Sequence, residues 1–215
     1  MNLFDYISDN IALLAFEFYQ YASMVFQCVV IASIIGIALA VLSYRSSWAA
    51  SLTTGTASVV FTIPSFALFG LMVPMFGLGV APAVIALVLY AMLPIVRNAI
   101  VGLQNVDKNM VDAARGMGMG RAAILLRVEL PLAWPVVLTG IRVASQLTMG
   151  VGAIAAYVSG PGLGDQIFSG LARLGGANAV NAILAGTLGI VVLALIFDAI
   201  FVLIGRLTTS RGLRV

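Results

Sequence analysis

The sequence is divided by long intervals that contain no charged residue. These intervals cover residues 18–44, 46–96, 143–164 and 174–197, and they hold 27, 51, 22 and 24 residues. An α-helix needs about 20 consecutive apolar residues to cross a hydrocarbon core of about 30 Å. Each interval can therefore hold one transmembrane helix, and the second interval can hold two.

The composition supports the same conclusion. Hydrophobic residues make up 62% of the chain and charged residues 9%, whereas soluble domains have about 45–50% apolar and about 25% charged residues. The 19 charged side chains, 11 basic and 8 acidic, cannot cover a water-facing surface of a chain of 215 residues. The sequence therefore predicts an integral membrane protein.

We expect an all-α, polytopic fold with about five transmembrane helices. The interval 46–96 is divided at Gly77-Leu78-Gly79, followed by Pro82, because Gly and Pro punctuate helices and Pro suits a first turn. The expected helices cover residues 21–42, 50–76, 81–103, 132–158 and 179–207.

The cationic residues predict the orientation of these helices. Five spans place the two termini on opposite sides, and ten of the 11 Lys and Arg residues then fall on one side, leaving only Arg173 on the other. The ten are Arg45, Arg97, Lys108, Arg115, Arg121, Arg127, Arg142, Arg206, Arg211 and Arg214. By the positive-inside rule that side is cytoplasmic, so we expect the N-terminus outside and the C-terminus inside. The basic excess then needs no nucleic-acid partner.

The two ends of the chain are expected to lie outside the membrane bundle. Asp5, Asp9 and Glu17 are acidic, whereas a cleaved signal peptide carries positive charge before its apolar stretch. We therefore interpret residues 1–20 as a retained external segment, and residues 208–215 as a cytoplasmic tail.

Small residues and prolines inside the spans predict how the helices pack. Small side chains recur every four residues in the first and fourth helices, which lets helix backbones approach closely. They are Ala32, Gly36 and Ala40, then Gly140, Ala144, Thr148, Gly152 and Ala156. Pro64, Pro74 and Pro94 remove backbone hydrogen bonds and are expected to bend their helices.

The residue inventory excludes several kinds of chemistry. The chain has no His, one Cys (Cys28) and one Lys (Lys108), so it cannot assemble a Cys/His metal site, an internal disulfide or an imidazole catalyst. It contains no G-x-x-x-x-G-K-[ST] sequence, so it cannot bind ATP through a P-loop. We expect no cofactor on this chain.

One cytoplasmic segment is unusually polar. Nine of the 19 charged residues lie within the 46 residues from Arg97 to Arg142, and residues 111–131 read VDAARGMGMGRAAILLRVELP. Local preferences predict a short helix over residues 107–115, a turn at Gly116, Gly118 and Gly120, and a second helix that ends at Pro131. A solvated connecting loop would be the simpler interpretation. Gly116-x-x-x-Gly120 also matches a membrane dimer motif, but its charged surroundings disfavour that interpretation.

The spacing in this segment resembles the cytoplasmic signature of ABC importer permeases, E-A-A, three residues, G, nine residues, I-x-L-P. The matching positions, in register without a gap, are Asp112, Ala113, Ala114, Gly118, Val128, Leu130 and Pro131. Asp112 replaces Glu and Val128 replaces Ile, which are conservative departures.

This resemblance implies a type I ABC importer permease fold over residues 21–207, with a coupling segment at residues 104–131. In this family the short helix docks into a separate ATPase subunit, which binds ATP and Mg. The resemblance further implies two ATPase subunits, a second copy or related permease, an external substrate-binding protein and a bacterial plasma membrane. The chain itself would be a transport subunit and not an enzyme.

Four further segments are similar to the osmoprotectant branch, which imports glycine betaine, choline and carnitine. They are Thr62-Ile63-Pro64-Ser65, Leu93-Pro94-Ile95-Val96-Arg97-Asn98, Val128-Glu129-Leu130-Pro131 and Gly160-Pro161-Gly162-Leu163-Gly164. Methionine and other amino-acid importers share the five-helix core, so an amino-acid substrate is the alternative. A membrane-embedded enzyme or a channel is disfavoured, because no polar cluster stands out and a channel needs no docking helix.

Several residues inside the spans are candidates for the translocation path or gate. Aromatic rings attract quaternary ammonium groups, and an acidic residue deep in a membrane faces protein or water. The candidates are Tyr90, Met92, Gln146, Met149, Tyr157 and Asp198. Packing is the alternative for the aromatic and Met side chains, and pairing with Arg142 or Arg97 is the favoured alternative for Asp198. The external connection 160–178 is expected to contain a short helical face, in an outer gate, a docking site or an ordinary surface loop.

Overall fold

The computed structural model describes residues 2–208, which form helices joined by short turns, without a β-strand in that range. The elements are α1 (Leu3–Asp9), α2 (Ile11–Ser43), α3 (Ser47–Thr62), α4 (Ser65–Phe76), α5 (Val80–Gln104), α6 (Lys108–Gly116), α7 (Arg121–Ile124), the π-helical η1 (Leu125–Glu129), α8 (Leu130–Gly152), the 3-10 helix η2 (Ala153–Val158), α9 (Gly164–Ala172) and α10 (Ala179–Thr208). Most of the predicted tail, including Arg211 and Arg214, lies outside the described residues.

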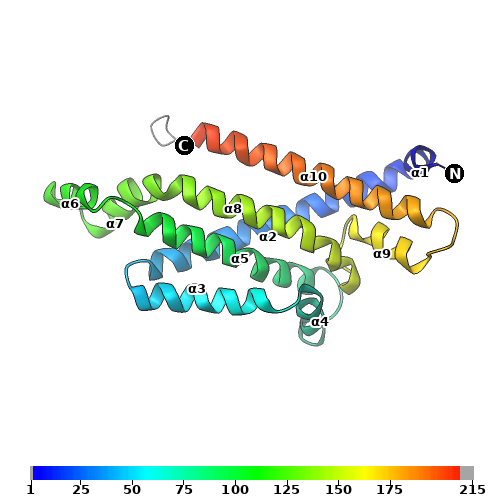
Figure 1. Cartoon of the computed structure of the whole chain (residues 1–215), viewed down its shortest axis with the longest axis horizontal. Helices are drawn as coiled ribbons and strands as arrows, with labels where there is room; N and C mark the ends of the chain where they lie inside the picture. The colour runs from blue at the N-terminus through cyan, green and yellow to red at the C-terminus, as the bar shows by residue number, and fades with distance from the viewer. Residues whose placement is uncertain (1, 209–215) are drawn as a thin grey trace.

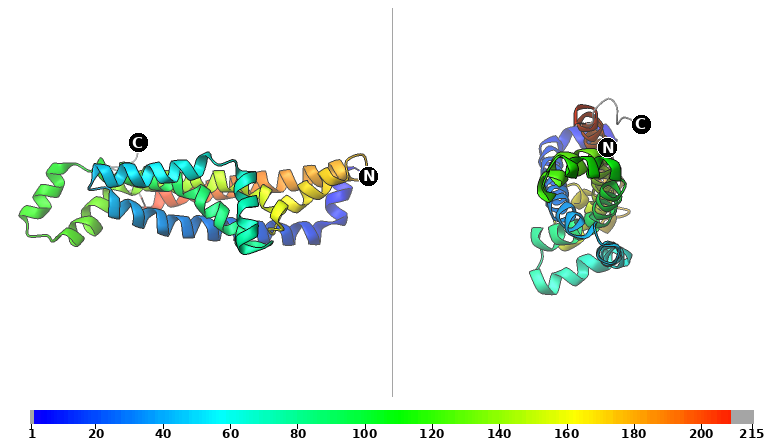
Figure 2. Two further views of the ribbon diagram at one scale, coloured as in Figure 1. Left: turned by 90° about the horizontal axis from the view of Figure 1, so that it is seen from below. Right: turned by 90° about the vertical axis from the view of Figure 1, so that its left-hand side faces the viewer.

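The long helices run side by side along one axis of an elongated bundle (Figure 1). The short helices α1 and α9 lie at one end, and α6 and α7 lie at the other (Figures 1 and 2). The start of α1 and the end of α10 are at opposite ends of the bundle, as an odd number of crossings requires (Figure 1).

Four helical stretches are long and apolar enough to cross a membrane, namely α2, α5, the continuous stretch over Arg121–Val158, and α10. The second predicted span, residues 50–76, is broken: α3 and α4 meet at an angle of 94°. Ile63, between the two helices, has an extended backbone (φ −66°, ψ 126°), the conformation that a following proline favours, and Pro64 has no N–H to continue the helix. The prediction of a bend at Pro64 is confirmed, and α4 lies across the bundle (Figure 2).

The predicted bounds are close for α5 and α10 but wrong for the first span. Helix α2 begins at Ile11, ten residues earlier than predicted, and has 33 residues. The only charged residue in the added part is Glu17, and the Gln166 side chain donates a hydrogen bond to its carboxylate across 3.1 Å. The acidic side chain is thus accommodated within the helix, and it does not mark the position where the helix starts.

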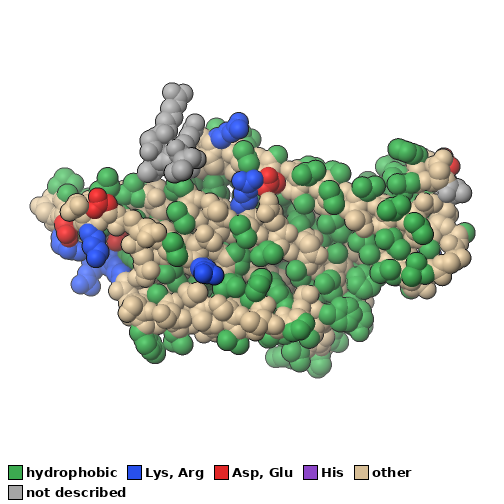
Figure 3. Space-filling view, in the orientation of Figure 1, with side chains coloured by type: hydrophobic (Ala, Val, Ile, Leu, Met, Phe, Trp, Pro, Cys, Tyr) green, Lys and Arg blue, Asp and Glu red, His purple; other side chains and the backbone are tan. Residues whose placement is uncertain are grey.

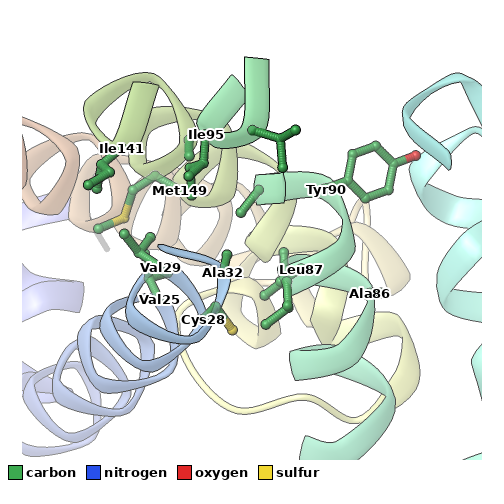
Figure 4. Close-up of a cluster of buried hydrophobic side chains, with 14 of the residues drawn as sticks. Val25, Cys28, Val29, Ala32, Ala86, Leu87, Tyr90, Ile95, Ile141 and Met149 are labelled. Atoms are coloured by element: carbon green, nitrogen blue, oxygen red, sulfur yellow. The ribbon is translucent and has the colours of Figure 1, made fainter. Parts of the chain in front are cut away.

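Helix α5 is the centre of the bundle and packs against α2, α3, α4 and α8. The small residues predicted to face other helices are buried, except for the half-buried Ala156, and Ala32, Ala40 and Ala144 are fully inaccessible. A side chain on Gly140 of α8 would place its Cβ 2.6 Å from the Asn98 Cβ of α5, so only glycine allows this approach. Figure 4 shows the side chains of α2, α5 and α8 that meet in this core.

Helix α10 is peripheral. Only 6% of its most apolar stretch of 18 residues is buried, compared with 56% for α5. The exposed surface includes Leu188, Leu195 and Leu203, which are 47–65% exposed. Such a surface is suited to lipid or to another membrane helix and not to water.

Candidate functional site: a projecting helix and an intramembrane polar cluster

Helix α6 occupies the position of the predicted short helix and is capped at both ends. At its start, the Asp107 side chain accepts a hydrogen bond from the Asn109 amide across 2.8 Å. At its end, the Met119 amide donates to the Ala114 carbonyl across 3.1 Å, and the Gly118 amide donates to the Arg115 carbonyl across 2.9 Å. This is the Schellman arrangement, which needs a left-handed residue just after the helix.

Gly118 supplies that residue, with φ of +81°. The spacing between Ala114 and Gly118 in the signature is therefore the spacing of a helix stop. The predicted turn is confirmed at Gly118, while Gly116 is the last helical residue and Gly120 directly precedes α7. The reversal brings the chain back towards the bundle as α7.

The outer surface of α6 has few neighbours within the chain. Asp112 and Ala113 are exposed, whereas Ala114 is 2% exposed and faces inwards. Asp112 pairs with Arg115 across 2.9 Å on the solvent side. Helix α6 and its turn project beyond the end of the long helices (Figure 2), and basic side chains gather next to them (Figure 3). This end of the molecule offers a small, polar, protruding surface.

The last part of the signature lies where α7 passes into α8. The predicted helix end at Pro131 is wrong, because the helix continues through Pro131 and reaches Val158. Just before the proline the chain widens into the π-helical η1, where the Leu130 amide donates to Leu125, five residues back. The wider turn accommodates the ring that would clash with a carbonyl of a regular α-helix. Val128 lies within this turn, and Leu130 packs against the core.

A buried network that sequence reasoning missed holds this junction. Glu129 is 7% exposed, and its carboxylate accepts hydrogen bonds from the Tyr44 hydroxyl across 2.6 Å and from Arg45 across 3.3 Å. Burial and the hydrogen bond to Glu129 raise the pKa of the Tyr44 phenol, which therefore remains a donor. The network joins the end of α2 to the base of α7 and α8.

A second polar cluster lies within the membrane-spanning helices. Arg142 of α8 donates to Asp198 of α10 through Nε and Nη2, across 2.6 and 2.7 Å, and Gln146 donates to the same carboxylate across 2.7 Å. The structure therefore selects Arg142, and not Arg97, as the partner of Asp198. The side chains of Arg142 and Asp198 are 41% and 28% exposed, so this cluster is accessible from outside the bundle.

The other path candidates are scattered. Tyr90 donates to the Ile63 carbonyl at the α3–α4 break and packs edge-on against Phe61. Met149 is 1% exposed and faces the core (Figure 4). Both side chains therefore contribute to packing within the chain.

Met92 and Tyr157 are more accessible. Met92 is half-buried and lines an apolar groove of about 350 Å³ between α2, α3 and α5. Tyr157 is 54% exposed and lies against Phe66 of α4, with ring centroids 4.1 Å apart. The structure thus brings together Gln146 and Asp198 but not the six candidates as one site. Among residues 2–208, no group of three His, Cys, Asp or Glu side chains is placed to hold a metal ion.

Residues 32–210 match the family described as "Binding-protein-dependent transport system inner membrane component". The chain belongs to this family. It is a permease subunit of an ABC importer, a multi-pass protein of the bacterial plasma membrane, and its helices are those of a type I importer.

Several curated relatives are similar over most of their length. The permease is 39% identical over 219 residues to the osmoprotectant import permease protein OsmW of Salmonella typhimurium, covering 100% of both chains. It is 30% identical to the choline transport system permease protein OpuBB of Bacillus subtilis, covering 99% of this chain and 96% of the relative. The glycine betaine/carnitine/choline permease OpuCB of Bacillus subtilis is 34% identical, with 86% and 84% covered.

Solved structures share the fold. A chain of the inward-facing MetNI methionine ABC transporter superposes with a TM-score of 0.81, at 22% identity, covering 93% of this permease and 98% of that chain. A chain of an amino acid ABC transporter gives a TM-score of 0.77 at 19% identity, with 96% and 98% covered. At this identity the likeness concerns the fold alone.

Proposed function

We propose that this permease forms the translocation path for a quaternary ammonium osmoprotectant such as glycine betaine, choline or carnitine. The observation that carries the proposal is the similarity along the whole chain to relatives named as osmoprotectant, choline and glycine betaine permeases. Methionine and amino-acid importers share the fold, but at only 19–22% identity. An amino-acid substrate is therefore the second candidate.

The proposed mechanism needs partners that supply what this chain lacks. An external binding protein would deliver the substrate, and two ATPase subunits would bind ATP and Mg. A second permease, either an identical copy or a related chain, would complete the path. The exposed apolar surface of α10 supports contact with lipid or with such a membrane partner.

We assign the coupling role to α6 and its Gly118 turn. The support is geometric, since α6 is capped at both ends, projects from the bundle and exposes Asp112 and Ala113. Movement of an ATPase against α6 would be passed through α7 and η1 to α8, because α7, η1 and α8 form one continuous helix. The Glu129–Tyr44 hydrogen bond would carry the same movement to α2.

In this proposal the α6 end is cytoplasmic and the α1 end is external. The basic side chains next to α6 and α7 support this orientation. Gln146 and Asp198 are the path residues that we favour, because they form an accessible polar cluster within membrane helices.

The first experiment is uptake of labelled glycine betaine by cells with and without this gene, at raised external osmolarity. Unlabelled choline, carnitine and methionine serve as competitors. Uptake that depends on the gene and is competed by the quaternary amines supports the proposal. Gene-dependent transport of an amino acid, with unchanged glycine betaine uptake, would replace the substrate assignment by the second candidate.

A further inference from the structure

A pocket of about 290 Å³ opens at the end of the bundle opposite α6, between α1, α9 and the first turns of α2 and α10. This volume is at the lower end of the range of small-molecule sites, about 300–1,000 Å³. The charged and aromatic residues in its lining are Tyr6, Glu17, Asp165 and Arg173. The coupling role of α6 and the intramembrane cluster involve none of these side chains.

Glu17 is the unusual member of this lining. Its side chain belongs to α2 and the residue is only 7% exposed. One carboxylate oxygen accepts a hydrogen bond from Gln166 across 3.1 Å, while the other, Oε2, is buried and has no hydrogen-bond partner in the described part of the chain. A buried acceptor without a donor destabilises a fold by the lost hydration of that group.

The surrounding contacts hold Glu17 in this position. The Gln166 amide donates to Glu17, and its oxygen accepts from the Tyr6 hydroxyl across 2.9 Å. The chain Tyr6–Gln166–Glu17 thus joins α1, α9 and α2 around the pocket. Oε2 is enclosed by the protein, so a ligand in the pocket would feel the negative charge of Glu17 through space and would not touch this oxygen. A carboxylate fixed in this way beside the pocket favours a positively charged ligand.

The remaining charges of the lining are of both signs. Asp165 is exposed and adds a second negative group, and Arg173 adds a positive one. Within residues 2–208, no ion pair joins Arg173 or Asp165 to an oppositely charged side chain. The lining therefore offers two carboxylates, a phenol ring and a guanidinium to a ligand.

We propose that this pocket is a substrate site at the outer end of the permease, selective for zwitterions that carry an ammonium group and a carboxylate. The ammonium group lies against the ring of Tyr6 and is attracted by the negative charges of Asp165 and of the enclosed Glu17, and the ligand carboxylate is held by Arg173. The inference rests on the proposed function, and it places a second contact site for the substrate on the permease itself.

The test is equilibrium binding of labelled glycine betaine and labelled choline to the purified permease–ATPase complex without the binding protein. Choline has the ammonium group but no carboxylate, so the two probes separate the two halves of the site. We expect Glu17→Gln to raise the dissociation constants of both probes about tenfold, equivalent to about 1.4 kcal/mol. Arg173→Gln should raise that of glycine betaine about tenfold and that of choline less than twofold.

Asp9→Asn is the matched control, because Asp9 is an exposed carboxylate at the same end of the molecule but outside the lining. It should leave both constants unchanged. Arg173 and Asp165 are on the surface, so Arg173→Gln and Asp165→Asn remain informative if Glu17→Gln does not fold.

Equal dissociation constants for wild type, Arg173→Gln and Asp165→Asn would contradict the proposed site. The absence of saturable binding to the wild type would contradict it as well. Uptake of glycine betaine by wild-type cells, measured in parallel, separates the two proposals. Normal uptake with unaltered binding in the variants rejects only the pocket, whereas absent uptake rejects the proposed function as well.

Discussion

Arg142 and Asp198 are joined by two parallel hydrogen bonds, from Nε to Oδ1 across 2.6 Å and from Nη2 to Oδ2 across 2.7 Å. This geometry is the strongest form of a charged hydrogen bond between side chains. It connects α8 to α10, a helix with little other buried surface. The pair is therefore expected to determine where α10 lies against the rest of the bundle.

Asp198→Asn should lower the midpoint temperature of thermal unfolding in detergent by a few degrees. The substitution removes the charge that pairs with Arg142 inside a membrane-spanning segment, where a lone guanidinium is unfavourable. The double variant with Arg142→Gln should lose no more stability than the single variant, because the two residues share one interaction. An unchanged midpoint together with altered uptake would show that Asp198 acts in the path but does not hold α10 in place.

Gly118→Leu should uncouple ATP hydrolysis from transport while the transmembrane helices remain folded. A φ of +81° is unfavourable for leucine, and holding it there costs about 1–3 kcal/mol. The α6 end would then relax and change the direction of the proposed docking helix. In reconstituted transporter, we expect ATPase activity to persist and substrate uptake to fall at least tenfold.

Gly116→Ala is the control for this variant. Gly116 is helical, and no atom lies within 4 Å of the position of an added Cβ. Uptake should remain near the wild-type rate. Gly118→Asn should retain more uptake than Gly118→Leu, because asparagine tolerates the left-handed conformation. Wild-type uptake by Gly118→Leu would argue against the coupling role.

The sequence predicted the span of α10 to within one residue and that of α5 to within one residue at each end. These helices follow from hydropathy and helix length, which depend on local sequence. The start of α2 could not be found in this way. Glu17 is accommodated by Gln166, which is 149 residues away in the chain, and no local signal announces such a contact.

In the candidate site, too, local sequence predicted the local structures but not the contacts between distant residues. The Ala114–Gly118 spacing predicted the end of α6 correctly, because a Schellman stop is a local structure. The bond between Tyr44 and Glu129 links residues 85 apart, and the local sequence around Glu129 indicated a helix end in place of a π-turn. Hydrogen bonds between distant residues therefore account for most of what the sequence did not reveal.

Tyr44→Phe should destabilise the junction of α2 with α8 by about 1–3 kcal/mol. The variant retains the ring but removes the hydroxyl that donates to the buried Glu129 carboxylate across 2.6 Å and accepts from Arg45. Chemical unfolding in detergent measures the change. Tyr19→Phe is the control, since Tyr19 is 69% exposed and should tolerate the substitution with a change below about 0.5 kcal/mol. Equal stability of the two variants would show that the Glu129 network does not stabilise the junction.

Two alanine substitutions in α8 should have opposite effects on stability. At Gly140, an added Cβ would lie 2.6 Å from the Asn98 Cβ and 2.8 Å from the Pro94 carbonyl oxygen. Gly140→Ala therefore forces α5 and α8 apart, at a cost of about 1–3 kcal/mol. At Gly150, the same Cβ meets no atom within 4 Å, so Gly150→Ala should stabilise the helix by about 0.5–1 kcal/mol. Thermal unfolding of both variants in one detergent provides the comparison, and stabilisation by both would contradict the close α5–α8 approach on which this fold depends.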